Sequence, residues 1–258
     1  MVSGWKIVVI MPAFNAEKTL ERTYRDIPKN LVDSIILVDD NSTDNTVSIA
    51  RDLGIQVIVH EKNLGYGGNQ KTCYRAALEE QADIVVMIHP DYQYDATKIG
   101  ELVAPIIAGR CDAVFGSRIL HNGALKGGMP LYKFFANKFL TVMENLVFKQ
   151  HLSEYHTGLR AYSSRLLRSL YLSLNSDDFV FDTEIIAQLT ALGCQIEEIP
   201  VETRYFPEAS SINFRRSVSY GVQTLLVLLK YLLHQADIST SMQFEVKRSA
   251  KKTEGESG

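Results

Sequence analysis

The sequence has little of what would place it in a specialised class of protein. Its three cysteines, Cys73, Cys111 and Cys194, are scattered and lack the spacing of a metal site, so we interpret them as small core residues in a reducing cytosol. The formal net charge of -3 gives no overall basic field, and we expect no nucleic acid as a partner. With 46% hydrophobic and 22% charged residues, the 258-residue chain is instead typical of a globular protein with a sizeable core.

The chain also lacks a signal-peptide pattern at residues 1–5 and an uninterrupted apolar run of about 20 residues. We therefore expect a cytoplasmic protein, with a peripheral position at the inner face of the membrane as a further option. The most apolar segment, residues 217–234, contains Lys230 and a partly polar side, which favours packing or surface contact over spanning. The polar tail, residues 237–258, is expected to be disordered.

Apolar runs alternate with helical patterns through the first half of the chain. This alternation predicts an α/β fold with a mostly parallel central sheet covered by helices on both faces. The expected strands are residues 6–11, 34–38, 56–59, 83–88 and 112–115. The expected helices are residues 16–27, a segment capped by Ser42 or Thr43 that ends near Leu53, residues 67–80 and residues 96–108.

The second half is less regular. The expected elements are a loop over residues 121–130, helices over 131–148, 165–174 and 182–192, a strand over 196–204 and the apolar segment 217–234. We divide the chain into a main domain, residues 1–216, a C-terminal helix, residues 217–236, and the polar tail. The two apolar helices, 131–148 and 217–234, are candidates for contact with a membrane surface, and the alternatives are core packing or the interface of a homo-oligomer.

The segment Val86-Met87-Ile88-His89-Pro90-Asp91-Tyr92-Gln93 carries the strongest chemical signal. A buried strand ends at a proline and is followed by Asp91 and Gln93, whose side chains can face the same way because side chains alternate along an extended chain. Carboxylate and amide oxygens suit a Mg²⁺ or Mn²⁺ ion that also holds phosphates. In an open α/β sheet, ligands bind outside the carboxyl ends of the strands. A surface turn after a core strand is the alternative for this segment alone.

Further polar or glycine-rich clusters follow the other predicted strands. They are Pro12-Ala13-Phe14-Asn15, Asp39-Asp40-Asn41-Ser42-Thr43-Asp44, Asn63-Leu64-Gly65-Tyr66-Gly67-Gly68-Asn69 and Gly116-Ser117-Arg118. Each has a structural alternative by itself, since Asp39 and Asp40 could cap a helix and the glycines could form a turn. Clusters at five successive strand ends together predict a site for a nucleotide whose diphosphate is neutralised by a metal.

The order of these clusters resembles the family-2 inverting glycosyltransferases and, within them, the dolichyl-phosphate mannose synthase and polyprenyl-phosphate glycosyltransferase group. Glu17, Thr157-Gly158-Leu159-Arg160 and Phe181-Asp182-Thr183-Glu184 also match, and the resemblance covers residues 7–214. It implies a nucleotide-sugar-binding α/β fold of the type called GT-A. It also implies an enzyme that moves a sugar from a nucleoside-diphosphate sugar to an acceptor.

The resemblance further implies roles for individual residues. Asp91 and Gln93 would bind Mg²⁺ or Mn²⁺ on the donor diphosphate, and Asp91 would act in catalysis together with Arg118 and Arg160. The two arginines would contact phosphate on the donor or on a lipid-phosphate acceptor, since a guanidinium fork fits phosphate oxygens. The donor would be bound by Pro12, Ala13, Phe14, Asn15, Glu17, Asp39, Asp40, Asn63, Gly67, His89 and Asp91.

Two positions depart from the family pattern. The family usually has Asp-x-Asp before the glutamine, but the first position here is His89, which can bind Mn²⁺ and carries no negative charge when neutral. The mannose synthases also tend to have a basic residue after a Gly-Ser or Ser-Ser pair. Here that stretch is 209–213, followed by Arg215 and Arg216, which either replace the acceptor-phosphate contact or form a solvated basic pair.

The acceptor determines how much proton transfer the reaction needs. A lipid monophosphate is already anionic near neutral pH, whereas a sugar hydroxyl needs a carboxylate base. Glu154 and Glu184 are the candidate bases and His156 a candidate acceptor contact, but none is compelling, so we favour a polyprenyl or dolichyl phosphate. His89 and the other departures favour a UDP-sugar over GDP-mannose.

Other functions are possible for such a site. A saccharide hydroxyl is the alternative acceptor, and a non-catalytic nucleotide-sugar-binding subunit is the alternative to an enzyme, because His89 replaces an acidic residue. A nucleotidyltransferase is disfavoured because the loop Pro12-Ala13-Phe14-Asn15 lacks the glycines and the basic residue that such an enzyme commonly has after its first strand.

Overall fold

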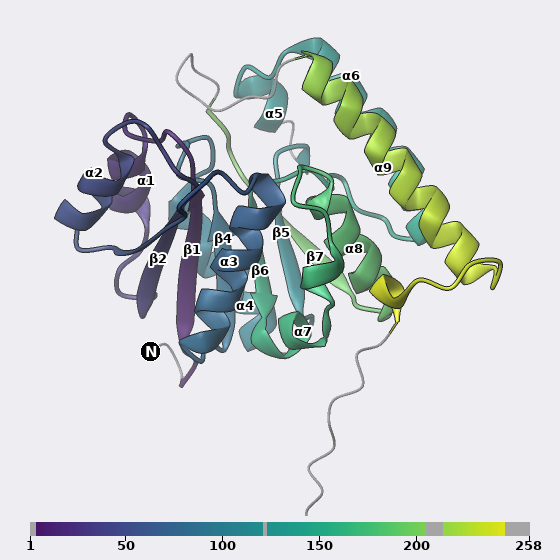
Figure 1. Ribbon diagram of the computed structural model, residues 1–258, viewed down its shortest axis with the longest axis horizontal. Coiled ribbons are helices and arrows are strands. Elements are labelled where there is room, and N and C mark those ends of the chain that lie inside the picture. The colour runs from purple at the N-terminus through teal and green to yellow at the C-terminus, as the bar shows by residue number, and fades with distance from the viewer. Residues whose placement is uncertain (1–3, 121–122, 205–213, 246–258) are drawn as a thin grey trace, which may run out of the picture.

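The computed structural model describes residues 4–120, 123–204 and 214–245. Its centre is a seven-stranded sheet in the order β3-β2-β1-β4-β6-β5-β7 (Figure 1). The strands are β1 (Ile7–Ala13), β2 (Ser34–Asp39), β3 (Gln56–Val59), β4 (Ile84–Ile88), β5 (Ala113–Ser117), β6 (Leu159–Ser163) and β7 (Ile196–Pro200). Only β6 among them runs antiparallel to its neighbours, β4 and β5, so the prediction of a mostly parallel sheet is confirmed.

Strand β6 was not predicted, and it determines what lies beside β4. The two strands pair so that Leu159, the first residue of β6, is opposite Ile88, the last residue of β4. The residues that precede β6 therefore reach the edge at which the parallel strands end. We call this edge, where Ala13, Asp39, Val59, Ile88 and Ser117 end their strands, the carboxyl edge.

Helices cover both faces of the sheet, as predicted. One face packs against α3 (Tyr66–Glu79), α7 (Ser164–Ser169) and α8 (Phe181–Ala191), and the other against α1 (Leu20–Asp26), α2 (Thr46–Asp52) and α4 (Ile99–Ile107). The strands can be apolar on both sides because both sides are covered. In β1, for example, Val8 and Ile10 belong to the first core, whereas Ile7 and Val9 belong to the second.

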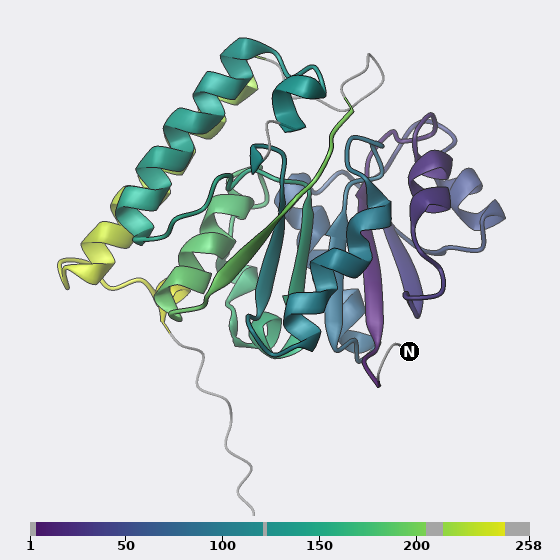
Figure 2. The same cartoon turned by 180° about the vertical axis from the view of Figure 1, so that it is seen from behind.

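Two long helices form a further layer outside this arrangement. The helix α9 (Phe214–Gln235) packs against α8 and against α6 (Leu131–Phe148), and it lies in front of α6 in Figure 1 and behind it in Figure 2. Thr224, Leu228 and Tyr231 of α9 are buried in these contacts. Within residues 4–120, 123–204 and 214–245, no helix has both the length and the apolar character that crossing a membrane requires.

Several predicted boundaries in the first and middle parts of the chain were wrong. The helix expected over 16–27 begins only at Leu20, since Thr19 precedes it and its hydroxyl donates to the backbone oxygen of Pro90 at 2.7 Å. The segment 165–174 is divided, because α7 ends at Ser169 and is followed by an extended residue and a 3-10 turn, η3 (Leu172–Leu174). The expected loop 121–130 contains a short helix, α5 (Gly123–Lys126).

The predicted boundaries near the C-terminus also change. The strand expected over 196–204 ends at Pro200, although the backbone N–H of Val201 still donates to the backbone oxygen of Ser117 at 2.9 Å. Order continues beyond α9, because the 3-10 turn η4 (Met242–Phe244) buries Gln243 and Phe244. The tail predicted to be disordered from 237 is therefore packed as far as Phe244, and residues 246–258 lie outside the described part.

Candidate active site

Asp40 organises the glycine-rich loop at the carboxyl edge. Its carboxylate accepts hydrogen bonds from the backbone N–H groups of Leu64 (2.8 Å) and Gly65 (3.0 Å) and from Nδ1 of His60 (2.8 Å). The Asn63 side chain donates to the backbone oxygen of Asp40 at 3.1 Å. In this conformation both carboxylate oxygens of Asp40 hold the loop, which is how Asn63 and Gly67 come to lie at this edge.

The loop after β1 is joined to the loop after β2. Asn15 accepts the backbone N–H of Thr43 at 2.9 Å and donates its own N–H to Ser42 at 2.8 Å. Glu17 accepts the backbone N–H of Asn45 at 3.1 Å. Phe14 is 54% exposed between these polar contacts and leaves an open aromatic surface. The first two predicted donor clusters therefore form one continuous structure.

Asp39 differs from its neighbour Asp40 in one respect. Its Oδ2 accepts the backbone N–H of Ser42 at 2.9 Å, but its buried Oδ1 has no partner among the described residues. A buried carboxylate oxygen without a donor is uncommon, because it loses its hydration without replacement. Of the two aspartates, Asp39 is thus the one with an unpaired acceptor, and that oxygen is closed to solvent in this conformation.

Asp91 is held in a tight turn after β4. Its Oδ1 accepts the backbone N–H of Gln93 at 3.0 Å, and Tyr92 between them adopts a φ of 59°. Burial raises the pKa of the Asp91 carboxyl to about 7, although the Gln93 N–H and the charge of Arg118 act in the opposite direction. A divalent cation would offset this desolvated charge, so the carboxylate suits a metal ligand.

The remaining donors for such a metal are few. No group of three or more His, Cys, Asp or Glu side chains in the described ranges could hold an ion by itself. Gln93 is buried next to Asp91, and its backbone oxygen accepts the N–H of Arg204 at 3.0 Å. One carboxylate, one amide and the adjacent imidazole of His89 form a donor set that fits Mn²⁺ or Mg²⁺ bound jointly with phosphate.

His89 is fitted closely against the start of β6. A Cβ atom at Gly158 would lie 2.2 Å from Cδ2 of His89 and 2.9 Å from a ring carbon of Tyr94, so only glycine allows this approach. Nε2 of His89 lies 3.0 Å from the hydroxyl of Tyr66. Burial lowers the pKa of His89 to about 4, and the ring is therefore neutral near pH 7. The Gly158 position within the predicted Thr157–Arg160 motif therefore lets His89 and Tyr94 pack closely against the start of β6.

Arg160 lies beneath the site and does not reach the surface. The side chain is fully buried, its Nη1 is 2.9 Å from Oδ1 of Asp182, and its Nη2 donates to the backbone oxygen of Tyr155 at 3.1 Å. The guanidinium carbon lies 5.3 Å from the ring centre of Phe115. In this conformation Arg160 has no access to phosphate. Sequence reasoning placed it in the site but could not show its burial.

Arg118 follows β5, on the other side of the predicted metal-binding segment after β4 from the loops that follow β1 and β2. Its Nε donates to Glu154 at 2.8 Å, and its backbone N–H donates to the same carboxylate at 2.8 Å. Burial raises the pKa of Asp91 and lowers the pKa of Lys133, and the nearby charge of Arg118 lowers both pKa values by a smaller amount. Lys133 of α6 was missed, because a lysine within an apolar helical stripe matches no motif. Arg118 and Lys133 therefore bring positive charge to the edge beside Asp91.

Other predicted residues are less closely tied to this centre. Arg215 and Arg216 are exposed at the start of α9. The preceding stretch 209–213 lies outside the described residues, so the predicted acceptor contact there stays a prediction.

The candidate bases are all engaged. Glu154 is fully buried and also accepts the side-chain N–H of Asn137 at 2.9 Å, in addition to Arg118. Glu184 accepts the backbone N–H of Ser176 at 2.5 Å. In this conformation the two carboxylates therefore hold neighbouring groups in place by hydrogen bonds and are not free to act as a base.

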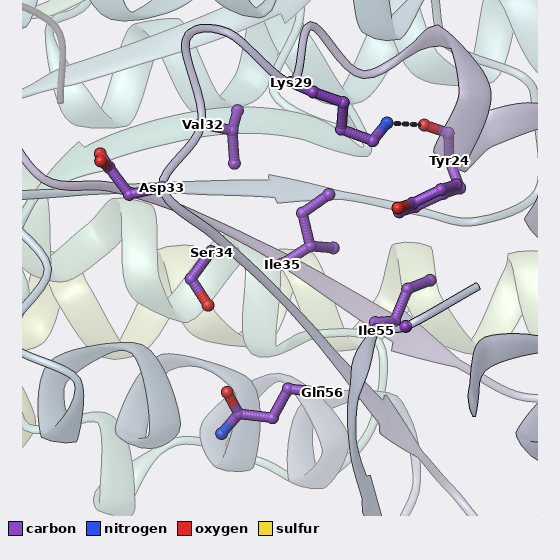
Figure 3. Close-up of a pocket in the computed structure, with 9 residues that line it drawn as sticks. Tyr24, Lys29, Val32, Asp33, Ser34, Ile35, Ile55 and Gln56 are labelled. Atoms are coloured by element: carbon purple, nitrogen blue, oxygen red, sulfur yellow. Dashed lines mark hydrogen bonds between the residues drawn. The ribbon is translucent and has the colours of Figure 1, made fainter. Parts of the chain in front are cut away.

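Surface pockets lie near both ends of β2. One of about 580 Å³ lies at the carboxyl edge beside Asp40 and is lined by Val59, His60, Glu61, Lys62 and Leu64. The other, of about 360 Å³, lies at the opposite end of β2, where Lys29 donates to the backbone oxygen of Tyr24 (Figure 3). The second pocket contains none of the predicted site residues, whereas the first adjoins them.

The chain is similar to known proteins over most of its length. The family model "Glycosyl transferase family 2" matches residues 8–171. The UDP-N-acetylglucosamine--dolichyl-phosphate N-acetylglucosaminyltransferase of Methanococcus voltae is 30% identical over 243 residues, covering 87% of this chain and 96% of that protein. An uncharacterized protein of Methanocaldococcus jannaschii, MJ1222, is 31% identical over 200 residues, covering 78% of this chain and 82% of its own.

Solved structures show the same fold. Glucosyl-3-phosphoglycerate synthase from Mycobacterium tuberculosis in complex with phosphoglyceric acid has a TM-score of 0.68 and 22% identity, covering 88% of this chain and 80% of that chain. Its complex with Mn²⁺ and UDP-glucose has a TM-score of 0.66 and 22% identity, covering 88% and 79% respectively. The predicted GT-A type of fold is thereby confirmed.

The buried ion pair gives a first prediction. Replacing Arg160 with methionine leaves Asp182 buried without its counter-charge, so Arg160→Met should lower the free energy of unfolding by about 3–5 kcal/mol. The control is Arg165→Met, because the Arg165 side chain is 84% exposed and pairs with Asp112 at the surface, where the loss should be below about 1 kcal/mol. Urea unfolding followed by circular dichroism measures both, and equal losses would contradict the assignment.

The raised pKa of Asp91 gives a second prediction, for the metal-free protein. The usual pKa of 3.8 becomes about 7 on folding, so the folded state holds this proton more tightly than the unfolded chain does. The stabilisation is complete below about pH 4 and is lost as the pH rises through about 7. Urea unfolding of the wild type and Asp91→Asn should therefore show a stability difference that changes across this range. A difference that stays constant with pH would refute the shift.

Proposed function

The chain belongs to glycosyltransferase family 2, and from that premise we propose that it transfers a sugar from a UDP-sugar to a polyprenyl or dolichyl phosphate, with Mg²⁺ or Mn²⁺ on the donor diphosphate. The observation that carries the proposal is the position of Asp91, a desolvated carboxylate between the donor clusters on one side and Arg118 on the other. The similarity to the Methanococcus voltae transferase, whose name specifies UDP-N-acetylglucosamine and dolichyl phosphate, supports this donor and acceptor.

On the donor side, the chain supplies an aromatic surface and polar groups. Phe14 and the loop that Asn15 joins to Thr43 would receive the nucleoside, and Asp39 would hold that loop through the backbone N–H of Ser42. A metal held by Asp91, with Gln93 beside it, would supply the positive charge that neutralises the departing diphosphate. Positioning and charge, rather than covalent chemistry, are what these residues contribute.

On the acceptor side, the chain supplies cations. In an inverting transfer, an acceptor phosphate oxygen forms a bond to the anomeric carbon while the bond from that carbon to the diphosphate breaks. The acceptor oxygen is already anionic, so no proton has to be removed. Arg118 is oriented by Glu154, and Lys133 adds a second charge close to it. That Glu154 and Glu184 are both engaged supports a phosphate over a hydroxyl acceptor.

A lipid acceptor requires contact with a membrane, and α6 and α9 offer a surface for it. We call their exposed apolar side chains the α6–α9 face, which comprises Leu131, Tyr132, Phe135, Phe139, Val142 and Leu146 of α6 and Val218, Val222, Leu225, Leu226, Leu229 and Leu232 of α9. An amphipathic helix of this kind lies in the membrane interface with its apolar side in the lipid.

The charges on these two helices favour a lipid surface over a second copy of the chain. Their basic residues are Lys133, Lys138, Arg215, Arg216 and Lys230, and their one acidic residue, Glu144, is fully buried. The whole chain is nonetheless negative, at -3. Basic groups around an apolar face attract anionic headgroups and would repel the same face of a partner. The peripheral position expected from the sequence fits this surface.

The transfer itself is the third prediction. The purified chain, given Mn²⁺, a polyprenyl phosphate in detergent and a panel of UDP-sugars and GDP-mannose, should form a lipid-linked sugar from a UDP-sugar. Asp91→Asn should lower kcat by about 100-fold, because the variant would lose the metal whose positive charge offsets the leaving diphosphate. Asp95→Asn is the control, since Asp95 lies on the same loop and only caps the turn at Thr97.

Other outcomes of this assay would overturn the proposal. Transfer to a saccharide hydroxyl but not to the lipid phosphate would show that the proposed lipid-phosphate acceptor is wrong. Binding of UDP-sugars without turnover under any of these conditions would indicate a non-catalytic subunit.

Membrane contact is the fourth prediction. The wild type should sediment with vesicles that contain anionic lipid, and Phe135→Glu combined with Phe139→Glu should reduce the bound fraction at least about tenfold, because two charges would enter the apolar layer. Val59→Glu is the control, since Val59 is 45% exposed on the edge strand β3, outside the α6–α9 face. The prediction would be contradicted if the wild type did not bind vesicles but formed a dimer, and if the double variant were monomeric. That result would show that the α6–α9 face binds a second copy of the chain.

A further inference from the structure

Tyr66 and Asp182 determine which nitrogen of His89 carries the proton. The Tyr66 hydroxyl has one proton and donates it to Oδ2 of Asp182 at 2.8 Å. Asp182 also accepts from Nε2 of Gln70 at 3.1 Å and pairs with Arg160 at 2.9 Å, so it acts as an acceptor throughout. The Tyr66 oxygen must then accept from His89 across their 3.0 Å contact, which places the proton on Nε2.

The other nitrogen of His89 is left with a lone pair. A neutral imidazole carries one N–H, so a proton on Nε2 makes Nδ1 an acceptor or a metal ligand. Nδ1 lies on the side of the ring opposite to Cδ2, and Cδ2 is the atom that packs against Gly158. Nδ1 therefore faces away from β6, and no described residue hydrogen-bonds to it, while His89 stays partly exposed.

We propose that Nδ1 of His89 is a ligand of the same divalent metal as Asp91, and that Tyr66 and Asp182 act as positioning residues that fix its tautomer. The proposal rests on the proposed metal-dependent function. An imidazole held by a hydrogen-bonded chain that ends in a carboxylate is a common arrangement for metal-binding histidines, because the outer partner orients the ring. Here the chain runs from His89 through Tyr66 to Asp182.

This ligand has a consequence for metal preference. A nitrogen ligand replaces a negatively charged oxygen at this position, which reduces the affinity for Mg²⁺ more than for Mn²⁺. Mg²⁺ prefers oxygen ligands, whereas imidazole suits the first-row transition metals. The site should therefore favour Mn²⁺ over Mg²⁺ by a margin that His89→Asp reduces.

Pulsed electron paramagnetic resonance on bound Mn²⁺ tests the ligand directly. With UDP present, the spectrum of protein labelled with ¹⁵N-histidine should differ from that of unlabelled protein through coupling to one imidazole nitrogen. The difference should vanish in His89→Asp and persist in His151→Gln, a control at an exposed histidine. Bound Mn²⁺ without this coupling would overturn the His89 assignment alone. No Mn²⁺ binding at all would overturn the metal-dependent function beneath it.

Tyr66→Phe tests the positioning residues. Without the hydroxyl, the imidazole proton can occupy either nitrogen, so Mn²⁺ affinity should fall about 10-fold. The ¹⁵N chemical shifts of His89 in the metal-free protein should change from the single Nε2–H tautomer to a mixture. Tyr132→Phe, at an exposed tyrosine of α6, is the control. A folded Tyr66→Phe protein with unchanged affinity and unchanged tautomer would contradict the role of Tyr66.

Discussion

The buried ion pair between Arg160 and Asp182 joins the sheet to the helices that carry the candidate site. Arg160 lies on β6 and Asp182 on α8, and Asp182 in turn accepts hydrogen bonds from Tyr66 and Gln70 of α3. An isolated charge at this depth would be strongly unfavourable, so each partner requires the other. The pair thereby fixes three elements relative to one another directly below His89.

The parts of the fold that follow simple periodicity could be predicted from the sequence. The parallel strands are apolar runs because both of their faces are covered, and the clusters after them mark one edge of the sheet. Strand β6 could not be found in this way, because it contains Arg160 and passes directly into α7. Its antiparallel direction depends on pairing with β4 and β5, which are distant in the sequence.

The sequence motifs predicted which residues come together at the carboxyl edge, but the role of each in a site stays a prediction. The motifs located Asp40, Asp91 and Arg160, but burial and hydrogen bonding decide what each does. Asp40 holds the glycine loop, and Arg160 supports the site from below, whereas Asp91 retains the environment of a ligand. Lys133 belongs to no motif, and only the packing of α6 beside Arg118 brings it to the acceptor side. The same helix contributes to the α6–α9 face, so the positive charge proposed for the acceptor and the proposed lipid contact would both come from α6.

The central claim is that Asp91 binds the metal that neutralises the donor diphosphate. Crystals of the protein soaked with Mn²⁺ and UDP test it most directly, through the anomalous difference density of manganese. The account predicts one strong peak in direct contact with both the Asp91 carboxylate and the diphosphate oxygens, at the carboxyl edge of the sheet. Manganese bound elsewhere, or UDP bound with Asp91 turned away from its phosphates, would contradict it.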